Sequence, residues 1–213
     1  MHPPKHKLQT VALAVAGLAL LGQATWIFLG GQSEVANLGA VVVIAVLALS
    51  QARWRVWNAV TRIVLGLMFA GSVADRLGWF GEPGQDTVTW GGWEPFVEYT
   101  RNLVPSVLDS AAPFLAVSAT VVEVGLAVLL ILGVGGRLIA GVTAVLLVVF
   151  GVFMLTSVGF AEMASYAVTV MAAGAAVLAT SDTSWRLDRR LWGQFSPTDH
   201  QKSGVAGPRT PAK

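Results

Sequence analysis

The chain has no cysteine and only three histidines, and this scarcity excludes several kinds of chemistry. Without cysteine it can form no disulfide, no thiolate metal site and no thiol nucleophile. His2, His6 and His200 all lie in polar terminal segments, so they cannot ligate a haem within a membrane. The sequence also lacks a phosphate-binding loop, a dinucleotide fingerprint, a zinc signature and a Gly-x-Ser-x-Gly elbow. We therefore expect no metal site and no self-contained catalytic constellation.

Charge is also scarce, because 12% of the residues are charged and 54% are hydrophobic. An average soluble domain carries about 25% charged residues. The apolar residues gather in six runs, which are residues 8–30, 35–50, 58–78, 111–134, 138–157 and 163–180. Each run has about the length that a helix needs to cross a ~30 Å hydrocarbon core, and none alternates like a barrel strand. The sequence therefore predicts an all-α membrane protein with six transmembrane helices.

Tryptophan and the basic residues indicate how these helices are oriented. All eight tryptophans lie at or just beyond the ends of the runs, where an indole prefers the lipid headgroups. If the N-terminus is cytoplasmic, the cytoplasmic loops hold most of the lysines and arginines, and the opposite side keeps only Arg76 and Arg101. The positive-inside rule therefore predicts that both termini are cytoplasmic. Cleavage of residues 1–24 as a signal peptide is an alternative that leaves the remaining topology unchanged.

The runs divide the chain into four parts. A basic tail and a two-helix hairpin (1–50) precede a cytoplasmic loop (51–57), a four-helix membrane domain (58–180) with an outer loop (79–110), and a basic cytoplasmic tail (181–213) with a disordered end. In the outer loop, residues 93–108 have apolar residues at helical spacing. We expect a helix that ends or bends at Pro105 and lies either in the membrane interface or as a lid over the core. Residues 184–195 predict a second interfacial helix, at the inner leaflet.

Glu123 is the strongest candidate for a chemical role. It lies near the middle of residues 111–134, where an ionised carboxylate costs at least ~2.5 kcal/mol. It is either a proton-handling or ligand-anchoring carboxylate, or a glutamate that holds helices together by hydrogen bonding. Arg62 is its candidate partner, although Arg62 also fits an arginine that anchors the chain at the cytoplasmic face. Tyr99 and Tyr166, the only tyrosines, either donate to a quinone carbonyl or pack at the membrane interface.

Other charged residues have structural interpretations. Asp75 and Arg76 end the third run, and we expect them to join charged residues of the outer loop in a solvated cluster of little energetic weight. Arg137 begins the fifth run on the cytoplasmic side, and we expect it to anchor that helix in the membrane.

The four-helix part of the chain resembles the DoxX/DoxD-like family of bacterial and archaeal plasma-membrane proteins. The resemblance rests on RIVLGLMFAG at 62–71, GWFG at 78–81, EVGLAVLLILG at 123–133, GRLIA at 136–140 and Ser165-Tyr166. It covers about residues 58–180 and implies a four-helix bundle. Arg62, Glu123 and Arg137 are the polar positions that match the family's pattern. The hairpin before residue 58 and the length of the outer loop depart from that pattern.

Related members of this family include membrane subunits of thiosulfate:quinone oxidoreductase. The resemblance therefore implies an accessory subunit of a membrane redox complex, with no intrinsic cofactor, an associated quinone and a protein partner that supplies electrons. A non-catalytic scaffold that docks a partner enzyme is the alternative, followed by a carrier of lipids or small molecules. The bilayer is an expected partner and nucleic acid is not, because the net charge of +2 arises from the cytoplasmic face.

Overall fold

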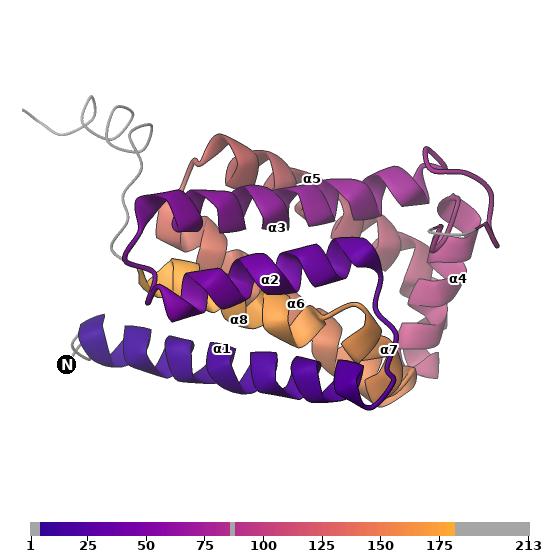
Figure 1. The fold of residues 1–213 in the computed structure, drawn as a ribbon. Helices are drawn as coiled ribbons and strands as arrows, with labels where there is room; N and C mark the ends of the chain where they lie inside the picture. Colours follow the sequence, from indigo (N-terminus) through magenta and orange to yellow (C-terminus); the bar gives the residue numbers. More distant parts are fainter. Residues whose placement is uncertain (1–4, 86–87, 182–213) are drawn as a thin grey trace, which may run out of the picture.

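A computed structural model describes residues 5–85 and 88–181 (Figure 1). These residues form eight α-helices and one 3-10 helix, with no strand in either range. In chain order they are α1 (Lys5–Phe28), α2 (Val35–Leu49), α3 (Arg55–Arg76), α4 (Trp93–Leu103), η1 (Ser106–Ala111), α5 (Ala112–Leu132), α6 (Gly136–Ser157), α7 (Phe160–Ser165) and α8 (Val168–Thr180). The predicted interfacial helix at 184–195, nearly all of the C-terminal tail and the first four residues of the N-terminal tail lie outside the described residues.

Four helices are long and apolar enough to cross a membrane. They are α1, α3, α5 with the preceding η1, and α6, whereas α2 and α8 are shorter apolar helices. Many large apolar side chains point outward, including Leu18 (70% exposed) and Phe114 (73% exposed). Such a surface suits hydrocarbon better than water, and helices satisfy their own backbone hydrogen bonds there. The chain is therefore a multi-pass helical membrane protein.

The connections between the long helices alternate between two ends of the bundle (Figure 1). Residues 29–34, 77–85, 88–111 and 158–167 gather at one end, which we call the α4 end. The start of α1, the α2–α3 and α5–α6 connections and the end of α8 lie at the opposite end. There the Ser181 hydroxyl donates to Asn58 Oδ1 at 3.1 Å, and Arg137 Nε donates to the Ser181 carbonyl at 2.8 Å.

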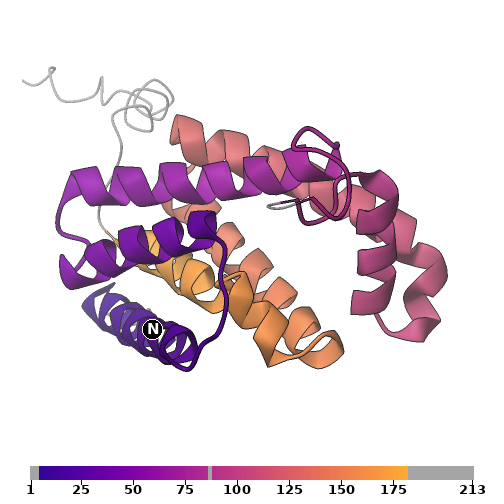
Figure 2. The same ribbon diagram turned by 45° about the vertical axis from the view of Figure 1, so that its right-hand side comes forward.

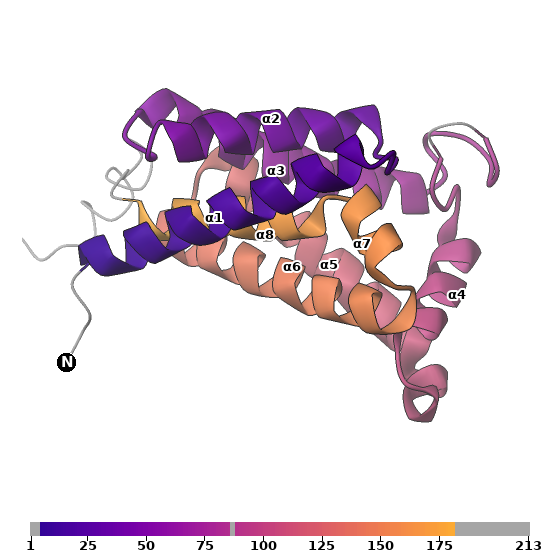
Figure 3. The ribbon, with the colours of Figure 1, turned by 60° about the horizontal axis from the view of Figure 1, so that its bottom comes forward.

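The core is built around α8, which is buried over most of its surface. Nine of its 13 residues are buried, and it packs against α6, α1, α2 and α3 (Figure 3). Glycines permit the closest helix approaches. A Cβ at Gly174 would lie 2.8 Å from Ile44 Cγ1 of α2, and one at Gly66 of α3 would lie 2.7 Å from Ile131 Cγ1 of α5. Small residues thus bring neighbouring helices into contact, as is common within membranes.

The predicted loop helix is present as α4, which lies across one end of the bundle (Figure 2). It contacts α5, α6 and α3, and its Phe96 and Thr100 are buried. The helix ends at Leu103, because the residue before a proline favours an extended backbone and Val104, before Pro105, has φ −93° and ψ 155°. These contacts match the predicted lid over the core.

The sixth predicted run is not one unbroken helix. It is divided into α7 and α8 by a turn at Tyr166 and Ala167, and Ala167 has a left-handed backbone with φ 52° although it is fully buried. Two buried amides donate to backbone carbonyls of this turn, one of which, at Ala164, also accepts from the Ala167 N–H. Gln23 Nε2 of α1 donates to the Ala164 carbonyl at 3.0 Å, and Asn37 Nδ2 of α2 donates to the Ser165 carbonyl at 3.2 Å. The N-terminal hairpin therefore stabilises the interruption in the last apolar run.

Candidate functional site

The centre of the candidate site is a buried ion pair between Arg76 and Glu123. Arg76 Nη2 lies 3.0 Å from Glu123 Oε1 and 2.9 Å from Oε2, and the two side chains are 4% and 1% exposed. Arg76 also donates to the hydroxyls of Ser72 and Thr120. Arg76 is the last residue of α3, but side chains on a helix tilt toward its N-terminus, so the guanidinium reaches back beside the middle of α5.

The prediction that Arg76 belongs to a solvated surface cluster is therefore wrong. Arg76 and Asp75 are both buried, with exposures of 3% and 4%. The expected partner of Glu123 was Arg62, but Arg76 takes that place. The position of Arg76 along α3 alone does not reveal how deeply its side chain is buried. The first turns of α5 extend past the end of α3, and α4 covers the space between them.

Two aromatic rings cover the ion pair on the side that faces the α4 end. Arg76 Cζ lies 3.7 Å from the ring centre of Phe96 and 5.0 Å from that of Trp90. The Trp90 ring contacts the rings of Phe96 and Tyr99, with centres 5.1 Å and 5.8 Å apart. A guanidinium over an aromatic face is attracted by the ring quadrupole, and the attraction is strongest where water is excluded.

Asp75 fixes the loop that carries Trp90. Its carboxylate accepts hydrogen bonds from the backbone N–H groups of Thr89 and Trp90 at 3.1 and 2.9 Å, and a longer one from Gly91 at 3.3 Å. Gly91 has φ 61°, a conformation that favours glycine. Consecutive N–H groups that converge on one anion form a compact turn. Asp75 therefore holds Trp90 in position over its neighbour Arg76.

Several ionisable side chains meet beside this loop. Burial, then the nearby Tyr166 and Glu162, raise the pKa of the Tyr99 phenol, whose hydroxyl is buried and has no hydrogen-bond partner among the described residues. The pKa of Glu34, in the α1–α2 connection, is also raised, first by partial burial and then by repulsion from Asp75. These groups come from four separate segments, which the fold brings to one end of the bundle.

Arg62 lies at the opposite end of the bundle. Its guanidinium packs against Gly133, where a Cβ would be 2.3 Å from Arg62 Nη2, and Gly133 ends α5 with φ 75°. An arginine at a helix C-terminus interacts favourably with the helix dipole. The predicted site residues were Glu123, Arg62, Tyr99 and Tyr166. The fold thus places the two tyrosines at the end of the bundle where Arg76 meets Glu123, and Arg62 at the other end.

One feature of the sequence points to Arg76, the site residue that the sequence analysis missed. Arg76 is one of only two basic residues on its predicted side of the membrane, and it lies within the last turn of a predicted span. A basic residue in such a position is expensive unless it is paired, so it is a candidate for the partner of an intramembrane acid. The aromatic cover could not be found in this way, because α4 and α3 are joined by a long loop.

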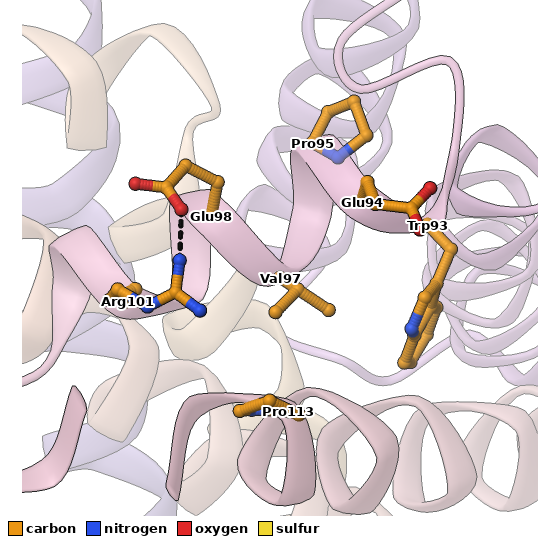
Figure 4. Close-up of a pocket in the computed structure, with 7 residues that line it drawn as sticks. All are labelled: Trp93, Glu94, Pro95, Val97, Glu98, Arg101 and Pro113. Carbon is orange, nitrogen blue, oxygen red and sulfur yellow. Dashed lines mark hydrogen bonds and ion pairs between the residues drawn. The ribbon is translucent and has the colours of Figure 1, made fainter. Parts of the chain in front are cut away.

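A second feature of the α4 end is an open groove between α4 and the first turn of α5 (Figure 4). Its volume is about 540 Å³, within the range of roughly 300–1,000 Å³ that ligand pockets have. Trp93 and Val97 point toward Pro113, and Glu98 pairs with Arg101 at one side. The lining residues are Trp93, Glu94, Pro95, Val97, Glu98, Arg101 and Pro113.

The fold and the site define a multi-pass helical membrane protein with a buried ion pair under a loop-borne aromatic cover. The described residues contain no cluster of His, Asp and Glu suited to a metal ion. Residues 58–156, from α3 through most of α6, match the DoxX family, so the chain carries a DoxX family domain. Neither a curated protein nor a solved structure matches the chain. The predicted extension of this domain to residue 180 stays a prediction.

Proposed function

We propose that all six apolar runs span the membrane and that both termini are cytoplasmic. The alternation of the connections between the two ends supports this topology, since it places the start of α1 and the end of α8 at the same end. Arg53, Arg55 and Arg137 are also at that end, whereas the α4 end has Arg101 as its basic surface residue in the described part. With this topology the α4 end faces the outside of a plasma membrane.

We further propose that the chain is an accessory subunit of a membrane redox complex that works with a quinone. The observation that carries this proposal is the Arg76–Glu123 pair. Arg76 Nε is buried and has no hydrogen-bond partner in the described part of the chain, and Glu123 Oε2, also buried, has only the ion-pair contact with Arg76 Nη2 at 2.9 Å. One unused donor and one carboxylate oxygen that can accept a further hydrogen bond lie beside aromatic rings, and this arrangement fits an aromatic ligand that accepts a hydrogen bond when oxidised and donates one when reduced.

In this role the quinone supplies the two-electron chemistry, with the electrons coming from a partner subunit. The protein's own residues bind the quinone and hold it in position. Arg76 donates a hydrogen bond and keeps Glu123 in place, while Glu123 holds or releases one proton at its carboxyl group. Trp90 and Phe96 exclude water from the pair, which strengthens its electrostatic interactions. Tyr99 and Tyr166 are further candidate donors, and Arg62 at the opposite end has a structural role.

The first experiment is to purify the tagged protein from native membranes in mild detergent, followed by proteomics and lipid extraction of one sample. A stoichiometric partner that carries flavin, haem or metal, together with quinone, is the expected result. Recovery of the chain alone and without quinone would contradict the proposal, because no source of electrons would be left. If the partner and quinone are recovered, Glu123→Gln should lower quinone content or turnover. Glu82 is an exposed acid outside the pair, so the control Glu82→Gln should leave both unchanged.

A non-catalytic scaffold is the second candidate function, and the groove on α4 favours it. A scaffold needs an exposed surface that is rigidly held, and α4 packs against three helices of the bundle. Deletion of residues 90–108 should abolish recovery of the partner enzyme. If the partner is still recovered, α4 is not its docking site.

A further inference from the structure

The groove beside α4 combines an apolar wall with exposed acids. Trp93, Val97 and Pro113 form the apolar part, and Glu94 and Glu98 lie at its rim (Figure 4). Glu98 is paired with Arg101, whereas no ion pair involves Glu94 in the described part of the chain. The groove therefore has an uncompensated negative charge beside an indole ring.

The surface around the groove is acidic as well. The acids at the α4 end that are exposed or half-buried are Glu34, Glu82, Glu94, Glu98, Asp109 and Glu162. In the described part of this end, Arg101 is the one basic side chain at the surface, since Arg76 is buried. A surface of one sign attracts partners of the opposite sign and speeds their association.

We propose that this groove is the docking site for a basic segment of the partner subunit. An apolar side chain of that segment lies between Trp93 and Val97, and a lysine or arginine beside it pairs with Glu94. A second basic side chain competes with Arg101 for Glu98. Aromatic and arginine contacts of this kind are enriched in protein interfaces. The inference rests on the proposed function in one respect, namely that a partner subunit exists.

The charge pattern favours a protein over the membrane as the occupant. Helices that lie in a membrane interface usually have lysine and arginine on their polar face, which attract anionic headgroups. The exposed charges of α4 are two glutamates and one arginine, so anionic headgroups would be repelled. The fixed position of α4 against α3, α5 and α6 also suits a preformed docking surface.

A binding measurement with a defined probe tests the charge requirement. The full chain is placed in phosphatidylcholine nanodiscs and titrated with a short fluorescent lysine–leucine peptide or its glutamate–leucine counterpart. We expect the basic peptide, but not the acidic one, to bind nanodiscs that contain the protein more strongly than it binds empty nanodiscs. Glu94→Gln/Glu98→Gln should weaken binding roughly tenfold, the scale of two partly exposed charge pairs. The matched control Glu82→Gln lies at the same end but outside the groove and should bind like the unaltered chain. Equal binding by the double variant, by both peptides or by empty nanodiscs would overturn the proposal.

A second measurement identifies the natural occupant. A photo-crosslinking residue at Val97 is activated in native membranes, and the attached peptide is sequenced. The expected product is a lysine- or arginine-containing segment of the partner subunit, and it should be lost in Glu94→Gln/Glu98→Gln. An acidic or neutral segment, lipid alone or no product would refute the docking site. Quinone content separates this outcome from failure of the proposed function: the groove variant should retain quinone, whereas Glu123→Gln should lose quinone and retain the crosslink.

Discussion

Glu123 is held within α5 by a guanidinium that belongs to the end of another helix. Both charges are removed from water, so each depends on the other for stabilisation. Arg76 is also stabilised by the hydroxyls of Ser72 and Thr120 and by the rings of Phe96 and Trp90. Breaking such a pair leaves one buried charge without compensation, which costs about 3–5 kcal/mol, whereas replacing both members by apolar residues is often tolerated.

The first prediction is a double-mutant cycle on this pair. Arg76→Met and Glu123→Leu should each lower the free energy of unfolding by about 3–5 kcal/mol, and the double variant should be more stable than either single variant. Reversible unfolding in mixed detergent micelles measures the three values. If the two losses simply add, Arg76 and Glu123 do not stabilise each other.

The second prediction concerns the ionisation of Tyr99. Burial, with the neighbouring Tyr166 and Glu162, raises its pKa, so the folded chain holds the phenol proton more tightly than the unfolded chain does. Folded stability should therefore fall as the pH rises above about 10, the ordinary pKa of tyrosine. Since the chain has two tyrosines, Tyr166→Phe leaves Tyr99 as the only source of tyrosinate absorbance. A native titration at the ordinary phenol pKa, equal to that of the denatured chain, would contradict the raised pKa.

Arg76 was misplaced from the sequence for a physical reason. Hydropathy gives the position of a residue along its own helix, but the depth of a long side chain depends on how the neighbouring helices are staggered. Glu123 needed no such information, because it is flanked by apolar residues for many positions on both sides. The intramembrane acid was therefore predictable, whereas the sequence marks Arg76 as one candidate partner and does not place it beside Glu123.

At the scale of elements, the loop before α4 acts as a tether for the aromatic cover. Asp75 is at the end of α3 and binds three consecutive N–H groups of the loop, and α4 begins two residues after the last of them. Hydrogen bonds to a charged acceptor contribute about 1.5–3 kcal/mol each. The position of α4 should therefore depend on a single carboxylate.

The third prediction tests this tether with a cysteine probe, for which a chain without cysteine is well suited. Thr100 faces the bundle from α4 and is 8% exposed, so Thr100→Cys should react slowly with a maleimide. Adding Asp75→Ala should accelerate the reaction by roughly 10- to 100-fold, as expected for the loss of about 1.4–2.8 kcal/mol. Thr156 on α6 is exposed, so the control Thr156→Cys should react equally fast with and without the Asp75→Ala change. Unchanged labelling at position 100 would show that other contacts hold α4.

The helices themselves were predictable to within a few residues, and the interruption between α7 and α8 was not. Apolar runs and Pro105 mark helices and their ends locally. The turn at Tyr166 and Ala167 contains neither glycine nor proline, and alanine is a good helix former. It depends on Gln23 and Asn37, which precede the residues whose carbonyls they bind, Ala164 and Ser165, by 141 and 128 positions. No local pattern reports a contact over that distance.

At the scale of the whole molecule, the N-terminal hairpin is an integral part of the bundle. Residues 58–156 match the DoxX family, but α8, which follows the match, is enclosed by α1 and α2 as well as by α6. Ile44 of α2 occupies the space left by Gly174. The hairpin therefore completes the core around the last helix.

The fourth prediction addresses this dependence. Asn37→Leu leaves the Ser165 carbonyl of the α7–α8 turn without its amide donor, and a buried polar group without a partner costs about 1–3 kcal/mol. Gln23→Leu removes a second donor from the Ala164 carbonyl, which keeps its bond from the Ala167 N–H, so its loss should be smaller. Both variants should lower the temperature at which half of the protein stays monodisperse in size-exclusion chromatography. Gln32→Leu, an exposed amide in the α1–α2 connection, serves as the control and should have little effect. Equal melting of all three variants would show that the turn does not rely on the hairpin.

The amides that stabilise the α7–α8 turn also have a consequence for biosynthesis. A ribosome completes Gln23 and Asn37 long before it makes the carbonyls that they bind. During that interval both amides need temporary partners, such as water, lipid headgroups or the insertion machinery. Assembly is complete only when the last apolar segment arrives and enters the space between α1, α2 and α6. A ribosome that stalls before that segment would therefore leave a membrane-inserted intermediate with exposed amides, which a membrane quality-control protease could recognise.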